Sequence, residues 1–419
     1  MALDRNTLGI LRNKNFKEYF VMTLASRSAT SVTMLVIVWY VFAVTQSAID
    51  VAIVGVTETL GAVILSLPAG VWVDRFNRLR LLILSNAIRA FSVTALIFYT
   101  LIYGFNLIVI IILLFAWTGA GELYRSGSYS VLPELVGKED LSAANGLERS
   151  GRGIFTAVSI AIGGTLILVV GASIALSWGA LGFFIALFYS MLLLSSNRGT
   201  IKRLSSKQEK EKSGYLELRD AITWLISQRG LFLLTISALL FNFFFTISYY
   251  FIVVYVKTGL SAGPLIYGAI LAFYSIGYAI GSPLVARSKW ALSYAGKVWI
   301  LVYGGSIGTS LLIMGIIPNS ILAILLFFIV GLGIGFAGNV WITSAQNIVP
   351  EEMRGRYFAF DGLLSFIGGP PAVAAGGVLV LVFGVITVFK LSGLIILIFV
   401  LCFSLFKSLW KLDGTGMSK

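Results

Sequence analysis

The chain has 419 residues, of which 58% are hydrophobic and 12% charged, and its formal net charge is +13. A soluble domain cannot bury so much apolar surface, and many stretches exceed 18 residues without a charge, so we predict a polytopic helical membrane protein. With no histidine and one cysteine, the usual ligands of zinc and haem and the usual catalytic base are missing, so we expect neither a metal nor a cofactor.

The apolar residues form twelve segments, each near or above the roughly 20 residues that a helix needs to cross a bilayer. Several breaks between them are inferred from Gly, Pro and Asn alone, as at 104–106, 170–173 and 318–319. The predicted spans are 18–44, 48–73, 80–103, 106–129, 143–170, 173–196, 230–256, 264–286, 295–317, 320–347, 357–383 and 386–408.

Charged residues fall inside the first four spans, where a charge is costly and marks a functional site by default. At 1.5 Å per residue, Arg27 and Glu122 both lie about 10 Å inside their helices, so we expect them to pair. The alternative is that Glu122 pairs with Arg125, which lies three residues on along the same helix face. Glu58 lies deeper, roughly 18 Å in, and is nearest in depth to Arg89.

These buried acids are candidates for carrying protons. Burial favours the protonated form of a carboxyl and a nearby arginine favours the ionised form, so a carboxyl whose partner changes can bind and release a proton. Glu58 and Glu122 are therefore the proton-coupling candidates, and Arg27, Arg89 and Arg125 are their charge partners. The alternative is a set of static pairs that fixes helix packing, and for Arg89 a structural role is the preferred interpretation.

The second and third spans are joined by residues 70–80, which read GVWVDRFNRLR. The three arginines keep this turn in water, because an arginine at the bilayer centre costs roughly 2.5–3.5 kcal/mol on insertion scales. Gly70 lacks a side chain where two helices can approach closely, and Asp74 can accept hydrogen bonds from a facing helix N-terminus. Basic residues alone would indicate only a cytoplasmic loop, but a glycine, an acid and arginines at one junction are a more specific signal.

The one long polar stretch, residues 197–220, is mixed in charge and typical of a solvated linker. It separates a six-helix half at 1–196 from a second at 221–419. The halves also repeat: VLPELVGKEDLSAANGL at 131–147 precedes the fifth span, and IVPEEMRGRYFAFDGL at 348–363 precedes the eleventh. A duplicated transporter fold predicts this correspondence, and chance similarity of two helix starts is the alternative.

Lysine and arginine lie almost entirely in the loops of one side of the predicted membrane. The other side holds little beyond Lys257 and Lys390. Because an excess of these residues marks the cytoplasm, we predict that both termini are cytoplasmic. Topology and anionic lipid explain the basic charge, and we expect the bilayer rather than nucleic acid as the partner.

The second half has almost no deep charge. Its polar and aromatic candidates for lining a substrate cavity are Asn242, Tyr249, Asn339 and Trp341. Few polar groups among aromatics suit a lipophilic or amphipathic substrate, although a tyrosine such as Tyr249 is also a common membrane-interface anchor.

Taken together, these features resemble those of major facilitator superfamily transporters. The spacing Gly-x-x-x-Asp-Arg-x-x-Arg at 70–78 resembles the superfamily's loop between helices 2 and 3. The stretches LRNKNFKEYF at 11–20, TQSA at 45–48 and VPEEMRGR at 349–356 resemble the subgroup of macrolide and siderophore exporters. One departure is that the fifth span lacks the Gly-Pro pair of many antiporters, whereas Gly-Gly-Pro-Pro occurs at 368–371.

This resemblance implies an all-α fold of two six-helix halves that rock around a midplane site, lined by the first, fourth, seventh and tenth spans. Near the start of the fifth span, Glu148 and Arg152 are spaced i, i+4 and suit a surface or gate ion pair. The resemblance also implies that Arg75 and Arg78 pair with acids of neighbouring helices and that Asp74 docks near 357–361. The expected cytoplasmic gate is then Gly70, Asp74, Arg75 and Arg78, with Arg354, Arg356 and Asp361 in the second half.

The sequence favours a secondary active transporter of the plasma membrane, monomeric and not an enzyme, that exports a small lipophilic or amphipathic molecule in exchange for protons. Import or uniport on the same fold is the alternative, since no residue excludes it. A lipid-modifying membrane enzyme would need a nucleophile and base or a metal, and a sensor would need a signalling domain. Neither is indicated.

Overall fold

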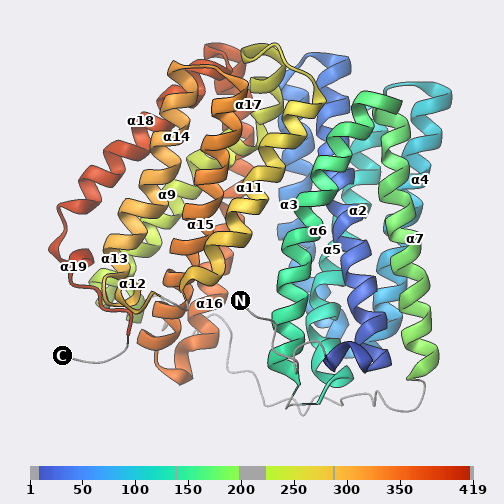
Figure 1. Cartoon of the computed structure of the whole chain (residues 1–419), viewed down its shortest axis with the longest axis horizontal. Helices are drawn as coiled ribbons and strands as arrows, with labels where there is room; N and C mark the ends of the chain where they lie inside the picture. The colour runs from blue at the N-terminus through green and yellow to red at the C-terminus, as the bar shows by residue number, and fades with distance from the viewer. Residues whose placement is uncertain (1–8, 138–139, 198–222, 286–287, 416–419) are drawn as a thin grey trace. The chain divides into compact units, whose positions relative to one another are not determined.

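The computed structural model describes residues 9–137, 140–197, 223–285 and 288–415 (Figure 1). These residues form helices joined by short turns, with no β-strand in the described ranges. The chain divides into two compact units. Unit 1 comprises residues 1–46 and 53–207, and unit 2 comprises residues 47–52 and 208–419.

Unit 1 is a bundle of six long helices preceded by a short 3₁₀ turn. Glycines with positive φ end two of the helices, Gly104 after α4 and Gly171 after α6. Asparagine side chains cap the starts of two others: Asn77 accepts from the amide of Arg80, and Asn106 from those of Ile108 and Val109. The elements are η1 (Ile10–Arg12), α2 (Lys14–Thr45), α3 (Ala48–Arg75), α4 (Arg78–Tyr103), α5 (Leu107–Leu135), α6 (Leu141–Val170) and α7 (Ala172–Ser196).

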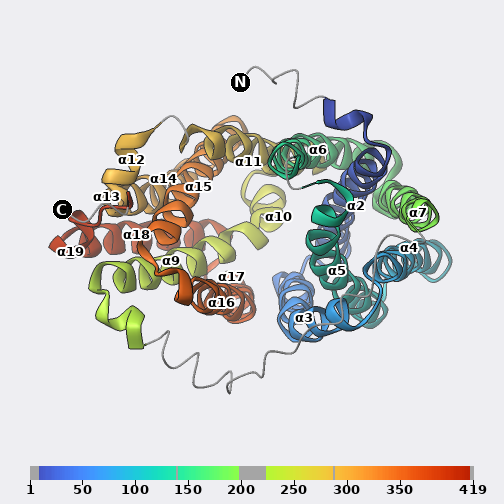
Figure 2. The ribbon, with the colours of Figure 1, turned by 90° about the horizontal axis from the view of Figure 1, so that it is seen from below.

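Within unit 1, α2 is the central element. It packs against α5, α6 and α7, as the end-on view shows (Figure 2), and α4 packs between α5 and α7. At one end of the unit a continuous core of fully buried side chains joins α2, α4 and α5. Its members include Phe16, Tyr19, Met22, Leu79, Leu82, Val131 and Leu135.

Unit 2 contains more interrupted helices. Two of its long helical runs contain short π-helical turns, η2 and η4, and Asn319 caps α15 by accepting from the amide of Leu322. The elements are α9 (Arg229–Tyr250), α10 (Ile252–Val254), η2 (Tyr255–Gly259), α11 (Pro264–Leu284), α12 (Lys289–Ser293), α13 (Ala295–Val298), η4 (Trp299–Gly304), α14 (Gly305–Ile316), α15 (Ser320–Ile348), α16 (Glu351–Ile367), α17 (Gly369–Phe383), α18 (Val385–Ser404) and α19 (Lys407–Trp410).

A close helix contact of unit 2 joins α11 to α15 through glycines on both helices. A Cβ added to Gly277 or Gly281 would collide with backbone atoms of α15, and one added to Gly331 or Gly335 would collide with backbone atoms of α11. Both pairs have the Gly-x-x-x-Gly spacing that lets two membrane helices pack backbone to backbone. Gly281 therefore allows the close helix approach that was expected at its first-half counterpart, Gly70.

Eleven helices of the described chain are long and apolar enough to cross a membrane. The predicted span 357–383 is not one helix. The helix α16 ends at Ile367, and the 15-residue α17 begins after Gly368. The break occurs because Pro370 and Pro371 lack the backbone N–H groups that would continue the hydrogen bonds of α16. A count of twelve spans therefore stays a prediction.

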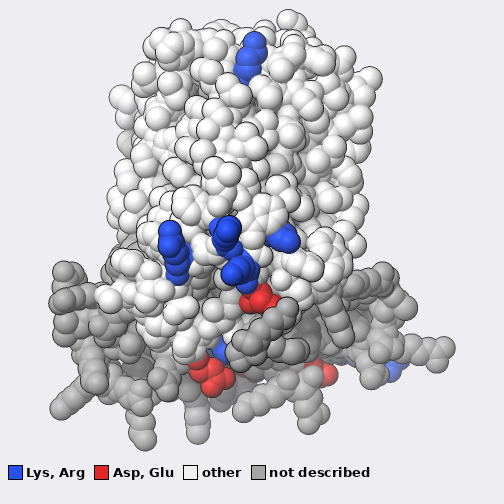
Figure 3. Space-filling model, turned by 90° about the vertical axis from the view of Figure 1, so that its left-hand side faces the viewer, with Lys and Arg blue, Asp and Glu red and all other residues white. Residues whose placement is uncertain are grey.

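Basic residues of unit 2 gather at one end of its helices. Figure 3 shows the face with α18 and α19, on which lysine and arginine concentrate toward the α19 end. There the ammonium of Lys297 lies 4.5 Å from the ring centre of Tyr294 and 5.2 Å from that of Trp410. Lys390 lies at the opposite end, against Gly315 near the end of α14. Cys402, the one cysteine of the chain, is exposed on α18.

Candidate functional site

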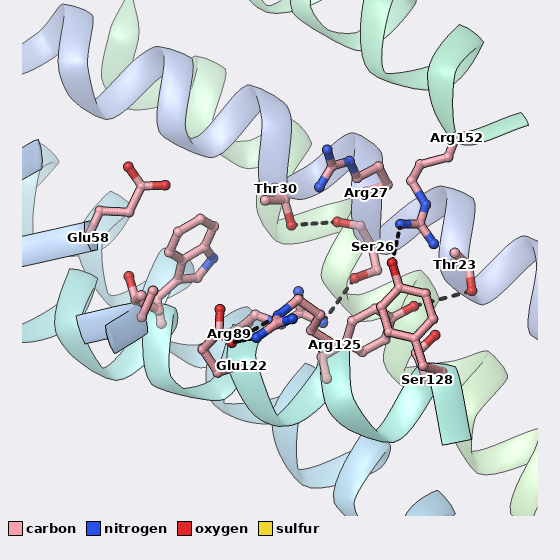
Figure 4. A pocket seen from close by; sticks show the side chains of 16 residues that line it. Thr23, Ser26, Arg27, Thr30, Glu58, Arg89, Glu122, Arg125, Ser128 and Arg152 are labelled. Atoms are coloured by element: carbon pink, nitrogen blue, oxygen red, sulfur yellow. Dashed lines mark hydrogen bonds and ion pairs between the residues drawn. The ribbon is translucent and has the colours of Figure 1, made fainter. Parts of the chain in front are cut away.

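Unit 1 contains a polar pocket of about 220 Å³, to which α2, α3, α4, α5 and α6 contribute (Figure 4). Its lining includes every intramembrane charge predicted from the sequence, although those residues are spread over almost a hundred positions of the chain. The lining residues are Thr23, Ser26, Arg27, Thr30, Glu58, Ala62, Arg89, Trp117, Thr118, Gly121, Glu122, Tyr124, Arg125, Ser128, Tyr129 and Arg152.

Glu122 pairs with Arg125 on its own helix. The Oε2 atom of Glu122 lies 2.5 Å from Nη2 and 2.9 Å from Nε of Arg125. The expected pair of Glu122 with Arg27 is therefore wrong, and the i, i+3 alternative is the pair that forms. Matching depth was a poor guide, because a neighbour one turn away on the same helix reaches the carboxylate without crossing the pocket.

Arg27 and Glu58 enter the pocket from α2 and α3, respectively (Figure 4). The Nε atom of Arg27 donates to the hydroxyl of Thr156 on α6 at 3.4 Å. Glu58 and Arg89, which were matched by depth, both line the pocket but form no ion pair with each other.

Arg89 is the most buried cation of the pocket, with 3% of its surface exposed. Its guanidinium carbon lies 4.4 Å from the ring centre of Tyr124 and 4.7 Å from that of Phe183. One nitrogen donates to Ser26 at 2.9 Å and to Asn86 at 2.5 Å. These contacts tie α4 to α2, α5 and α7, which fits the structural role expected for Arg89, but the side chain also faces the pocket.

At one edge of the pocket, Arg152 forms the predicted i, i+4 ion pair with Glu148. Glu148 is only 3% exposed and does not line the pocket, so its carboxylate neutralises Arg152 from outside the pocket. Arg152 also donates to the hydroxyl of Tyr129 at 3.2 Å.

The predicted hairpin at 70–80 is tighter than expected, because α3 continues to Arg75 and α4 begins at Arg78. Arg78 forms an ion pair with Glu134 of α5 and donates to the carbonyl of Ser130 at 3.2 Å, as expected for a pairing with a neighbouring helix. Among the described residues, a Cβ on Gly70 would meet no atom within 4 Å, so the close helix approach expected there is not found. The side chain of Asp74 lies outside the described residues, and its proposed latch stays a prediction.

The candidates of the second half all lie in unit 2, and their contacts differ. Asn242 accepts from the hydroxyl of Tyr303 at 2.7 Å, and Asn339 donates to the carbonyl of Gly335 on its own helix. The ring of Tyr249 lies 5.8 Å from that of Tyr274, and the ring of Trp341 lies 5.6 Å from that of Trp299. These contacts form aromatic clusters within unit 2.

The predicted gate residues of the second half lie on α16. Arg354 lies 3.6 Å from a carboxylate oxygen of Glu351 and donates to the carbonyl of Val349 at 3.2 Å. Asp361 lies two turns further on, partly buried. The side chain of Arg356 lies outside the described residues.

Sequence reasoning missed Glu134 and the neutral wall of the pocket. Glu134 was visible only as part of a repeated Pro-Glu turn, and nothing in its position indicated a partner 56 residues away. Trp117, Thr118 and Tyr124 read as ordinary members of an apolar helix. Their spacing with Glu122 and Arg125 along α5 was the available signal, because these positions recur at three and four residues.

Three comparisons relate the chain to known proteins. A family model described as "Major Facilitator Superfamily" matches residues 19–373. The multidrug efflux pump Tap of Mycolicibacterium fortuitum is 24% identical over 370 residues, which cover 84% of this chain and 86% of that protein. Macrolide efflux protein A of Streptococcus pyogenes is 23% identical over 424 aligned positions, covering 95% of this chain and 98% of that protein.

Solved structures show the same fold at low sequence identity. The nucleoside transporter NupG aligns with a TM-score of 0.75 at 11% identity, covering 94% of this chain and 99% of that one. A bacterial homologue of the iron transporter ferroportin, in an inward-facing state, aligns with a TM-score of 0.68 at 17% identity, covering 93% and 98%.

Proposed function

Since this chain belongs to the major facilitator superfamily, it is a multi-pass membrane transporter of a small molecule and not an enzyme, and we propose that it is a proton-coupled exporter of lipophilic or amphipathic compounds. The two relatives named as efflux proteins support export. The aromatic clusters of unit 2 support a substrate with an apolar body.

The observation that carries the proposal is the pocket of unit 1, in which Glu58 and Glu122 face four arginines inside a bundle of membrane-length helices. Ionisable groups at such a depth are retained for function far more often than for packing. Glu122 exchanges its ion pair with Arg125 for a proton when substrate or helix movement draws the arginine away. Glu58 is the second candidate carrier, because its carboxyl lines the same space.

The coupling is tested by measuring proton release from detergent-purified protein with a pH-indicator dye in weak buffer. Lipophilic cations, macrolides and siderophores are added in turn to the native protein and to the Glu58→Gln and Glu122→Gln variants. Glu134→Gln is the matched control, because it removes a carboxyl that also pairs with an arginine but lies outside the pocket. We expect substrate-dependent release that Glu58→Gln or Glu122→Gln abolishes and the control retains.

Binding of a compound without any proton signal would contradict proton coupling and leave transport intact. Direction is tested separately with inside-out membrane vesicles, in which an exporter accumulates substrate when a pH gradient is applied. Accumulation only in right-side-out vesicles would instead identify an importer, and equilibration without a gradient would identify a uniporter.

We also propose that the protein is a monomer in the plasma membrane and that both of its termini lie in the cytoplasm. The gathering of Arg229, Lys297, Lys407 and Lys411 near one end of unit 2, with Lys390 at the other, supports this orientation through the positive-inside rule. Gly70, Asp74, Arg75 and Arg78 are proposed as the cytoplasmic gate residues of unit 1, and Arg354, Arg356 and Asp361 as those of unit 2.

A further inference from the structure

The pocket of unit 1 holds more positive than negative charge. Its lining contributes four guanidinium groups, from Arg27, Arg89, Arg125 and Arg152, and two carboxyl groups, from Glu58 and Glu122. Glu148, which pairs with Arg152 from outside the lining, raises the number of carboxyl groups to three. Among the described residues one positive charge is in excess, and beside the buried guanidinium of Arg89 such an excess attracts an anion.

Arg89 contributes a charge that no carboxylate of the described chain neutralises. Its two hydrogen-bond acceptors, Ser26 and Asn86, are neutral, and aromatic rings lie against its guanidinium. Asn86 is held in place by donating its own amide to Ser190 at 2.9 Å. Arg89 is thus fixed in position before any ligand arrives.

The pocket also offers hydrogen-bond donors that have no acceptor. The Nε of Arg89, the indole Nε1 of Trp117 and the hydroxyl of Thr118 are buried and make no hydrogen bond within the described residues. All three side chains line the pocket and are at most 6% exposed. Arginine and tryptophan nitrogens can only donate, so what they lack is an acceptor. A buried donor without an acceptor is costly, and an oxyanion removes that cost.

We propose that this pocket binds the oxyanionic group, a carboxylate or an equivalent, of an amphipathic substrate. The inference rests on the proposed export function and narrows its substrate class to organic acids and zwitterions. The volume of about 220 Å³ is smaller than the roughly 300–1,000 Å³ of sites that enclose a whole drug-sized ligand, so the pocket receives the acidic end of the molecule.

The test uses rhodamine B, which carries a free carboxylate, and its ethyl ester, which has the same ring body without that charge. Fluorescence polarisation measures the binding of each dye to the full-length protein in a non-ionic detergent at neutral pH. We expect the native protein to bind the acid about tenfold more tightly than the ester, which is the change that one hydrogen bond to a charged group produces.

Two variants test the residues. Arg89→Gln is expected to remove most of the preference for the acid over the ester, and Arg89→Lys is expected to keep part of that preference. Because Arg89 also supports packing, Trp117→Phe provides an independent test: it keeps the ring that lies 6.3 Å from the ring of Phe183 but removes the donor. Arg149→Gln is the control, since that arginine is exposed and outside the pocket.

Tighter binding of the ester, equal binding of both dyes, or equal weakening of both by Trp117→Phe would overturn the inference. Failure of both dyes to bind would overturn it as well. None of these results bears on proton-coupled export, which is measured with other compounds. If the protein exported only cations in exchange for protons, the proposed export function would stand and the inference about organic acids would fail.

Discussion

At the scale of single residues, unit 1 is held by arginine–carboxylate pairs of two kinds. Arg125 with Glu122 and Arg152 with Glu148 are pairs within one helix, whereas Arg78 with Glu134 joins α4 to α5. The side chains of Arg78 and Glu134 are 19% and 21% exposed. A pair so far out of water is worth more than a surface ion pair, because removing one partner leaves the other charge poorly solvated.

Arg78→Gln is therefore expected to lower the stability of the protein by about 1–3 kcal/mol, since it leaves the carboxylate of Glu134 without its cation. Arg75→Gln is the control in the same hairpin, because Arg75 is exposed at the end of α3. Thermal unfolding in detergent, followed by tryptophan fluorescence, measures both. Equal unfolding midpoints for the two variants would mean that the pair with Glu134 contributes nothing.

Removal of the Arg152 side chain is expected to have a larger effect, about 3–5 kcal/mol, because Glu148 is almost fully buried. The double variant Arg152→Ala with Glu148→Ala is expected to be more stable than Arg152→Ala alone, since it also removes the buried charge. The same unfolding measurement compares the native protein, Arg152→Ala and the double variant, and a double variant less stable than Arg152→Ala alone would contradict this account.

The outcome for these pairs shows which residue contacts can be read from a sequence. The pair of Glu148 with Arg152 was predictable because an i, i+4 spacing places both on one helix face wherever the helix lies. The pair of Arg78 with Glu134 was anticipated only as a contact with some neighbouring acid. Its partner depends on how α4 packs on α5, and a spacing along the chain carries no information on that.

At the scale of elements, the contact of α11 with α15 is the most demanding in unit 2. Its glycines bring two backbones together, so the contact tolerates no added side chain. Of these glycines, Gly281 alone stood out in the sequence, as the counterpart of Gly70. No described residue packs within 4 Å of a Cβ at Gly70, so in the part of the chain that the structure describes the two equivalent positions differ in packing.

Gly331→Ala is expected to destabilise the protein by about 1–3 kcal/mol, because the new methyl group would collide with the carbonyl of Tyr274 and force the helices apart. Gly338→Ala, on the same helix, is the matched control. No atom of the described residues lies within 4 Å of its added Cβ, and alanine favours the helix by up to about 1 kcal/mol. Unfolding midpoints should fall for the first variant and stay level or rise for the second.

Helix boundaries were predictable where Gly or Asn ends a helix, as at 104–106, because the signal is local. The break at Gly368 was missed although the Gly-Gly-Pro-Pro run was noted, since an apolar segment of sufficient length was read as continuous. Proline removes the ladder hydrogen bonds whatever the hydropathy of its neighbours. At Gly368 the effect of the two prolines should have been weighted above the length of the apolar segment.

At the scale of the whole molecule, the proposed topology can be tested with fusions to alkaline phosphatase, which is active only outside the cytoplasm. A fusion after Gly104, between α4 and α5, is expected to be active. A fusion after Gly137, between α5 and α6, is expected to be inactive. The reverse pattern in intact bacterial cells would invert the orientation that the basic residues indicate.

The family and the transporter class were predictable from the sequence because they depend on composition, span count and a few short motifs. The pocket of unit 1 was only partly predictable. The sequence identified all six charged residues of its lining, five as intramembrane charges and Arg152 as the partner of Glu148 in an ion pair, but the convergence of α2 to α6 on one space is a property of the packed bundle. Whether that space binds an acid depends on donors such as Trp117, whose role is invisible until its neighbours are known.

The single thiol of Cys402 allows site-specific fluorescent labelling of the protein. It is the one cysteine in 419 residues and lies exposed on α18 of unit 2, so a maleimide fluorophore attaches at a single known place in the native chain. A second dye on one cysteine introduced at Ile108, which is 68% exposed on α5, would report the distance between the two units by energy transfer. Single molecules could then be followed through successive transport cycles with Ile108 as the one native residue replaced.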